Sequence, residues 1–163
     1  MPKKTLAIDQ VLIILAETPP EIAELSAGLE PAQLHAKPST NEWSANGVLG
    51  HLRACADVWG GGIGTIISQD WPTIRAVNPR TYINTTDYLE QEFHRSLQTF
   101  TAQRADLLAL LNPLRREAWS RKATVTGAGK PLRWTVLYYA RRLAGHERAH
   151  VKQINQIVRM VRR

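Results

Sequence analysis

The fold is decided by residues 135–161, TVLYYARRLAGHERAHVKQINQIVRMV, close to the C-terminal end of the chain. Thr135 places a hydroxyl ahead of the segment, which is a preferred N-cap of a helix. Apolar residues and two histidines then recur every three or four positions, which indicates one face of a long amphipathic helix. The residues of this expected inner face are Leu137 or Tyr139, Leu143, His146, His150, Ile154, Ile157 and Val161.

A second amphipathic helix is predicted to begin at Ala45, directly after the N-cap residue Ser44. Gly47 stands where a complete capping box would have Glu or Gln. The glycine-rich residues 60–64 interrupt the same helix, and a kink, close helix packing and an early end all remain open there. Its apolar positions are Val48, Leu49, Leu52, Cys55, Val58 and Trp59.

Two other helices complete the pattern. The clearest one is expected from about Thr86 to Leu111, before Asn112-Pro113. Near the N-terminus, a first helix should end near Glu17, because Pro19 and Pro20 cannot continue a regular helix without lost hydrogen bonds. A second short helix would follow at an angle or as a kinked continuation. Four principal antiparallel helices result.

The connections between these helices are long. Residues 30–43 are expected to form a loop with one helical turn near Gln33. Residues 69–83 show no sustained period and are interpreted as a long connection that could cover a site. Residues 124–131, which contain Gly127 and Gly129, are also expected to form a loop.

Length and composition favour one domain that spans residues 1–163. The chain has 163 residues, 44% of them hydrophobic, which is enough to bury a single core. No apolar stretch approaches the roughly 20 residues of a membrane span, and the start, Met1 to Leu6, lacks the features of a secretory signal. The single cysteine, Cys55, excludes an internal disulfide. We therefore expect a cytoplasmic protein with no membrane partner.

The formal charge of +7 raises nucleic acid as a possible partner, because clustered Lys and Arg gain affinity by displacing counterions from phosphates. Most of the densest basic group would face solvent on the last helix. A solvated face is therefore favoured over nucleic-acid binding. The group consists of Arg141, Arg142, Arg148, Lys152, Arg159, Arg162 and Arg163.

Three histidines form a candidate metal site. His146 and His150 are four residues apart, so their rings project from one helix face about one turn apart and can hold one ion together. Both lie on the apolar face, where an unpartnered imidazole is costly and an ion satisfies both rings. His51 is the natural third ligand, because it lies on the inward face of the other well-marked helix. An ordinary pair of polar side chains is the alternative interpretation.

The segment from His146 to His150 also matches the zinc-protease motif H-E-x-x-H, in which the glutamate activates the metal-bound water. Such proteases take a third ligand from downstream, but residues 151–163 contain no Asp, Glu, His or Gly. The order of residues therefore argues against a protease. Glu147 is offset from His146 by about 100° on the helix, which favours a solvent-facing salt bridge, with a role as catalytic base as the alternative.

Three motifs occur in the order Glu42-Trp43-Ser44, Gly50-His51-Leu52, and His146 to His150 followed by Gln153-Ile154. Together they resemble the DinB/YfiT-like superfamily of metalloenzymes over nearly the whole chain. The resemblance implies an all-α four-helix bundle of up-down-down-up type with long connections. It also implies that His51, His146 and His150 hold one divalent metal ion, zinc or nickel, with positions open to water. Gly47 and residues 60–64 depart from the family pattern.

The resemblance further implies a homodimeric metal-dependent transferase or hydrolase. Relatives such as bacillithiol S-transferases and mycothiol-dependent maleylpyruvate isomerase use a low-molecular-weight thiol, here with an electrophilic substrate. Arg142 is a candidate for holding an anionic substrate. Tyr139 and Gln153 are candidates for lining the thiol pocket or orienting the ligands, although surface and packing roles are the alternatives. A non-catalytic helical module, with a structural metal or none, is the rival class.

The other notable side chains are assigned to packing. Cys55, one turn beyond His51, is expected to be a small core residue, although it could approach an ion. His35 and His94 have no partner at ligand spacing and are left outside the site. The five tryptophans, at positions 43, 59, 71, 119 and 134, are expected to pack the core and the undersides of loops.

Overall fold

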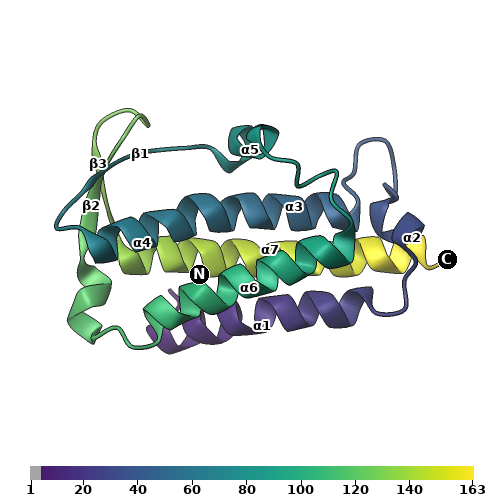
Figure 1. The fold of residues 1–163 in the computed structure, drawn as a ribbon, viewed down its shortest axis with the longest axis horizontal. Helices are drawn as coiled ribbons and strands as arrows, with labels where there is room; N and C mark the ends of the chain where they lie inside the picture. The colour runs from purple at the N-terminus through teal and green to yellow at the C-terminus, as the bar shows by residue number, and fades with distance from the viewer. Residues whose placement is uncertain (1–4) are drawn as a thin grey trace.

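The computed structural model describes residues 5–163, in which four long helical segments form a bundle (Figure 1). Helices α1 (Ile8–Ser26) and α7 (Val136–Val161) run in one direction. Helices α3 (Ala45–Cys55), α4 (Gly61–Ser68) and α6 (Phe93–Leu111) run in the other. This is the expected up-down-down-up order. The expectation about a secretory signal rests in part on residues 1–4, which lie outside the described residues.

The helix starts predicted around the histidines are confirmed. The hydroxyl of Ser44 accepts a hydrogen bond from the Gly47 backbone N–H at 2.9 Å, and that of Thr135 accepts from Tyr138 at 3.0 Å. Between α3 and α4, residues Ala56–Gly60 form one π-helical turn, so the helix continues through the glycines. Close packing explains one of them, because a Cβ on Gly62 would lie 3.0 Å from the ring of Tyr139.

Helix α1 corrects the prediction that a first helix ends near Glu17. It continues through Pro19 and Pro20 to Ser26. The carbonyl of Leu15, which a proline at position 19 deprives of its N–H donor, instead accepts from the Arg104 guanidinium at 2.9 Å. A side chain from α6 therefore replaces the lost backbone hydrogen bond.

Helix α6 begins at Phe93, seven residues later than the pattern from Thr86 predicts. Glu92 is the reason, because its carboxylate accepts from the backbone N–H groups of His94 and Arg95 at 3.0 and 2.9 Å and so caps the helix. Leu89, which was expected on the inner stripe, is 48% exposed.

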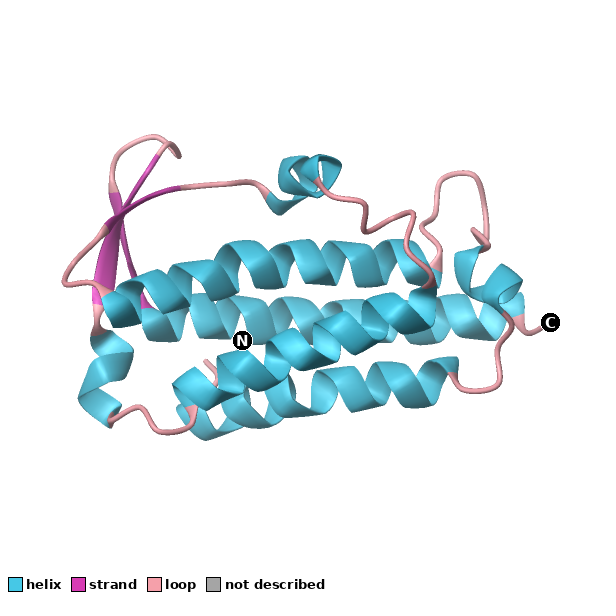
Figure 2. Ribbon diagram, viewed as in Figure 1, coloured by secondary structure: helices cyan, strands magenta, loops and turns pink. Residues whose placement is uncertain are grey.

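A small sheet lies at one end of the bundle and was not predicted (Figure 2). Its strand order is β1-β2-β3. Strand β1 (Thr73–Arg75) pairs parallel to β2 (Lys122–Thr126), which pairs antiparallel to β3 (Leu132–Thr135). Part of the expected loop 124–131 is therefore strand. The remaining short elements are α2 (Pro31–His35), which confirms the turn near Gln33, α5 (Pro79–Tyr82), and the 3-10 turns Ile83–Thr85 and Arg116–Ser120.

Residues 69–92, which we call the crossover, return along the length of the bundle over α3 (Figure 1). Such a return is required because α4 ends and α6 begins at opposite ends of the molecule. Side chains fix the crossover to α3 and to the π-helical turn that follows it. Asn46 Nδ2 donates to the carbonyls of Leu89 and Gln91 at 3.2 and 3.3 Å. The Asp57 carboxylate accepts from the hydroxyls of Tyr82, at 3.0 Å, and Tyr88.

The core consists of two hydrophobic clusters that follow each other along the bundle. One contains Leu15, Trp59 and Leu143 and lies towards the sheet. The other contains Leu52, Phe100 and Ile154. Among the helices of residues 5–163, none has the length and apolar character needed to cross a membrane.

Candidate metal centre

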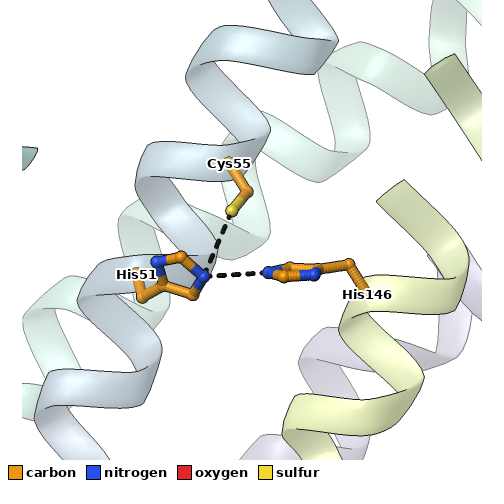
Figure 3. Close-up of side chains that lie close together, drawn as sticks. All are labelled: His51, Cys55 and His146. Carbon is orange, nitrogen blue, oxygen red and sulfur yellow. Dashed lines mark hydrogen bonds between the residues drawn. The ribbon is translucent and has the colours of Figure 1, made fainter. Parts of the chain in front are cut away.

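Three imidazole rings converge between α3 and α7, where the two hydrophobic clusters meet. His51 Nε2 lies 2.8 Å from His146 Nε2, which lies 3.1 Å from His150 Nε2. Figure 3 shows the rings of His51 and His146 pointing at each other across the gap between the helices. His51 is only 4% exposed, and the other two rings are half-buried. The structure therefore brings together the three residues expected from the sequence.

Hydrogen bonding sets the tautomer of His150. Its Nδ1 lies 2.7 Å from Oε1 of Gln153, and an amide oxygen can only accept. Nδ1 therefore carries the proton, and Nε2 of the neutral ring presents a lone pair to His146. Gln153 thus holds His150 in the form that binds a metal ion, as outer partners of metal-ligating histidines commonly do.

The neutral forms of His51 and His146 are strongly favoured. Burial, followed by the charges of His150 and Arg80, lowers the pKa of His51 to about 4. Burial, followed by neighbouring His150, His51, Arg142 and Arg80, lowers the pKa of His146 to about 4. Both rings are therefore uncharged near neutral pH, which is the state required of a ligand.

The arrangement fits a cation better than it fits a hydrogen-bond network. His150 Nε2 carries a lone pair and can only accept a hydrogen bond. A proton on His146 Nε2 could be donated to His150 or to His51, but it cannot point fully at both. One of the two close nitrogen pairs is therefore left without a hydrogen bond. A cation would accept all three lone pairs at once. Two nitrogens bound to one ion at about 2.0–2.1 Å lie roughly 3 Å apart, close to the two separations found here.

Cys55 lies beside this group on α3, one turn after His51. Its Sγ is 3.6 Å from His51 Nε2 (Figure 3). The potential ligand atoms of His51, Cys55 and His146 all lie within 4.8 Å of one another. Burial raises the pKa of the Cys55 thiol to about 12, with a further contribution from Glu147. Cys55 is thus a fully buried residue, as expected, and also a possible fourth ligand.

Two tryptophans enclose the rings. The ring of Trp43 lies 5.2 Å from that of His51 and stacks nearly parallel to His150 at 6.4 Å. The ring of Trp59 meets His146 edge-on at 5.1 Å. Trp43 therefore packs over the histidines, and it also lies beside Gly47 in the first turn of α3. Trp71 departs from its expected packing role, because it is 48% exposed on the sheet.

Glu147 corrects the expectation of a solvent-facing salt bridge. Its side chain is completely buried and both of its carboxylate oxygens accept from Arg104, one of them at 2.7 Å. The pair joins α7 to α6 rather than facing water. With both oxygens engaged by a buried guanidinium, the carboxylate is poorly suited to act as a base.

The other candidate residues lie around the site. Gln153 contacts His150 as described. Tyr139 is buried against Gly62, and the Arg142 guanidinium, which is exposed, lies 4.8 Å over the ring of Trp59. His35 and His94 lie outside the group of converging rings and are exposed.

Two basic residues, one in α7 and one directly after it, are engaged within the protein. Arg141 donates to the carbonyl of Leu6 at 2.7 Å, and Arg162 donates to the carbonyl of Ala27 at 3.0 Å. Arg148, Lys152 and Arg159 are exposed. The basic face of the helix is thus in part structural and in part solvated.

A cavity of about 430 Å³ lies beside His51. Trp43 and the start of α3 form one side, and Arg80 and Ile83 of the crossover form another. The connection after Trp71 therefore does border the site. Sequence patterns could not reveal the contribution of Arg80, because its position depends on the path of the crossover and carries no local signal.

Comparisons with known proteins agree with this description. Residues 14–154 match the DinB superfamily. The fold is similar to that of YfiT from Bacillus subtilis, described as a probable metal-dependent hydrolase with an unusual four-helix bundle topology. The similarity has a TM-score of 0.80 and 17% sequence identity, and covers 98% of this chain and 91% of YfiT. No curated protein sequence matches the chain. Since the family match spans most of its length, the chain belongs to the DinB superfamily.

Proposed function

We propose that the protein binds one divalent metal ion through His51, His146 and His150 and uses it to activate a nucleophile. The observation that carries this proposal is that His146 Nε2 lies 2.8 Å from His51 Nε2 and 3.1 Å from His150 Nε2, between α3 and α7. Three imidazoles leave positions on the ion for a reactant, which is the pattern of catalytic rather than structural sites.

When bound, the ion would lower the pKa of a coordinated thiol or water and so favour the deprotonated nucleophile. The protein's own residues prepare the site for this. Trp43 and Trp59 enclose the rings, which limits access of bulk water. The charges of Arg80 and Arg142 reach His146 and favour an anionic nucleophile or substrate there.

The best-supported nucleophile is a low-molecular-weight thiol that is transferred to an electrophilic substrate, because the sequence motifs resemble those of thiol-using relatives. Water is the alternative, since YfiT, which has a similar fold, is described as a probable hydrolase. Zinc and nickel are the proposed ions, because imidazole nitrogen suits both.

Metal analysis of the purified protein tests the site. We expect about one divalent ion per chain, loss of the ion in His51→Ala and His150→Ala, and retention in His94→Ala, which changes an exposed histidine outside the site. A wild-type protein that carries no ion and takes up neither zinc nor nickel would contradict the proposal.

Activity of the loaded protein tests the reaction. Thiols such as cysteine and glutathione would be incubated with electrophilic acceptors, and ester hydrolysis would be followed in parallel. A thiol adduct formed by the wild type but not by His150→Ala supports transfer. Ester hydrolysis that does not depend on added thiol supports water as the nucleophile. Stable metal binding with neither reaction would indicate the non-catalytic class.

A further inference from the structure

The residues that line the cavity beside His51 favour a negatively charged ligand. Its volume of about 430 Å³ is within the range of small-molecule sites. Lys37 and Arg80 supply two cationic side chains, and none of the lining residues is Asp or Glu. Within residues 5–163, neither Lys37 nor Arg80 forms a salt bridge. Both charges are therefore available to a ligand.

Arg80 is held in place over the cavity. Its guanidinium lies 5.4 Å over the ring of Trp43, a separation at which a cation and an aromatic face attract each other. Arg80 and His51 line the same cavity. The charge of Arg80 therefore lies close to both the cavity and the histidine centre.

The start of α3 adds to the positive potential. Ser44, Asn46 and Gly47, at the first turn of this 11-residue helix, line the cavity, and the N-terminus of a helix carries partial positive charge. Asn46 is 2% exposed and its Oδ1 has no hydrogen-bond partner among residues 5–163. An ordered water at this end of the cavity would supply the missing donor.

The remaining walls are apolar. Trp43, Ile83 and Leu89 face the same cavity, and Leu89 is 48% exposed although it is a large aliphatic side chain. An exposed aliphatic group at the rim of a cavity is available for contact with an apolar ligand.

We propose that this cavity binds the carboxylate-bearing reactant of the metal centre, with the carboxylate at Lys37 and Arg80 and the apolar part against Trp43, Ile83 and Leu89. The proposal rests on the proposed function, since it names the substrate class of the same site. It assigns to Arg80 a role in specificity, because its guanidinium lies over the ring of Trp43 and lines the cavity beside His51.

Calorimetric titration with matched acids and amides tests this assignment. The probes are 3-phenylpropionate and phenylacetate, each compared with its amide, on both zinc-loaded and chelator-treated protein. Of the two acids, we expect the one with the higher affinity to bind about tenfold more tightly than its own amide. Arg80→Gln should reduce the affinity for the acid about tenfold and leave that for the amide unchanged. Arg80→Lys should retain most of the preference.

The control variant is Arg159→Gln, which removes the same charge from an exposed position on α7 and should leave both affinities unchanged. Three results would overturn the proposal: no acid binds more tightly than its amide, Arg159→Gln has the same effect as Arg80→Gln, or the preference occurs only with zinc and is insensitive to Arg80→Gln. The last result would place the carboxylate on the ion.

The two proposals can fail separately. A protein that takes up no metal but still prefers acids through Arg80 would contradict the metal-dependent function and retain the substrate class. A protein that binds one ion per chain but shows no preference for acids over amides would contradict the substrate class and retain the metal site.

Discussion

Cys55 and Gln153 act on the same group of histidines in different ways. Gln153 accepts from Nδ1 of His150 and leaves its Nε2 free for an ion. Cys55 has its sulfur 3.6 Å from Nε2 of His51, but burial raises the pKa of the thiol to about 12. Without an ion this buried thiol is neutral, so Cys55 would have to lose its proton in order to bind one.

We predict that Cys55 is not a ligand. Cobalt-loaded wild-type protein should lack the near-ultraviolet charge-transfer band of a sulfur–cobalt bond, and Cys55→Ala should bind cobalt with unchanged stoichiometry and visible spectrum. The reason is that three imidazoles already complete the protein's share of a catalytic site. The measurement is the absorption spectrum of both loaded proteins, with His150→Ala as the variant that should lose cobalt. A band in the wild type that disappears in Cys55→Ala would make the sulfur a fourth ligand.

At the scale of the helices, Arg104 connects three elements. It pairs with the buried Glu147 of α7 and donates to the Leu15 carbonyl of α1, which Pro19 leaves without a backbone donor. Removal of one partner of a buried ion pair is far more costly than replacement of both by apolar groups. Because Glu147 follows His146 directly, this pair also fixes the part of α7 that presents the histidines.

Two glycines of α4 differ in their surroundings, so substituting each by alanine distinguishes the effect of packing on stability from the effect of helix propensity. Gly62→Ala should destabilise the protein by about 1–3 kcal/mol, because the new Cβ would meet the buried ring of Tyr139 at 3.0–3.1 Å. Gly64→Ala should stabilise it by up to about 1 kcal/mol, because nothing lies within 4 Å of a Cβ there. Urea denaturation measures both. Equal effects of the two substitutions would disprove the packing role of Gly62.

The parts of this structure that sequence predicts are those with local causes. Thr135, Ser44 and the helical spacing of His146 and His150 act within one or two turns, so their pattern identified both helices and the converging histidines. Glu147 was misassigned because its partner, Arg104, lies 43 residues away.

Local sequence patterns also could not predict features that depend on pairing between residues distant in sequence. Strand β1 has three residues and pairs with β2 about fifty positions later, so no run of alternating residues identifies it. The continuation of α1 through its prolines depends on a donor from α6. In each case the deciding partner is distant in sequence.

For the molecule as a whole, the histidine centre couples the two halves of the core. Cys55 and Trp59 belong to one hydrophobic cluster and Leu52 to the other, and His51 lies among them on α3. An ion that binds only the folded protein stabilises the fold by mass action. Without it, the buried uncharged rings must be kept free of protons, which links folding to pH.

We therefore predict that the chelator-treated protein loses stability as the pH falls from about 7 to about 5. In the folded protein the pKa values of His51 and His146 are about 4, whereas in the unfolded chain they return to about 6.5. Between these values the unfolded chain binds more protons, so a falling pH favours unfolding, by on the order of 1 kcal/mol for each histidine after allowance for partial solvation. Urea midpoints at pH 7 and pH 5 measure the effect. The double variant His51→Gln/His146→Gln should show a smaller change with pH than the wild type, whereas His94→Gln, which alters an exposed ring, should match the wild type. A pH dependence that persists unchanged in the double variant would mean that other groups cause it.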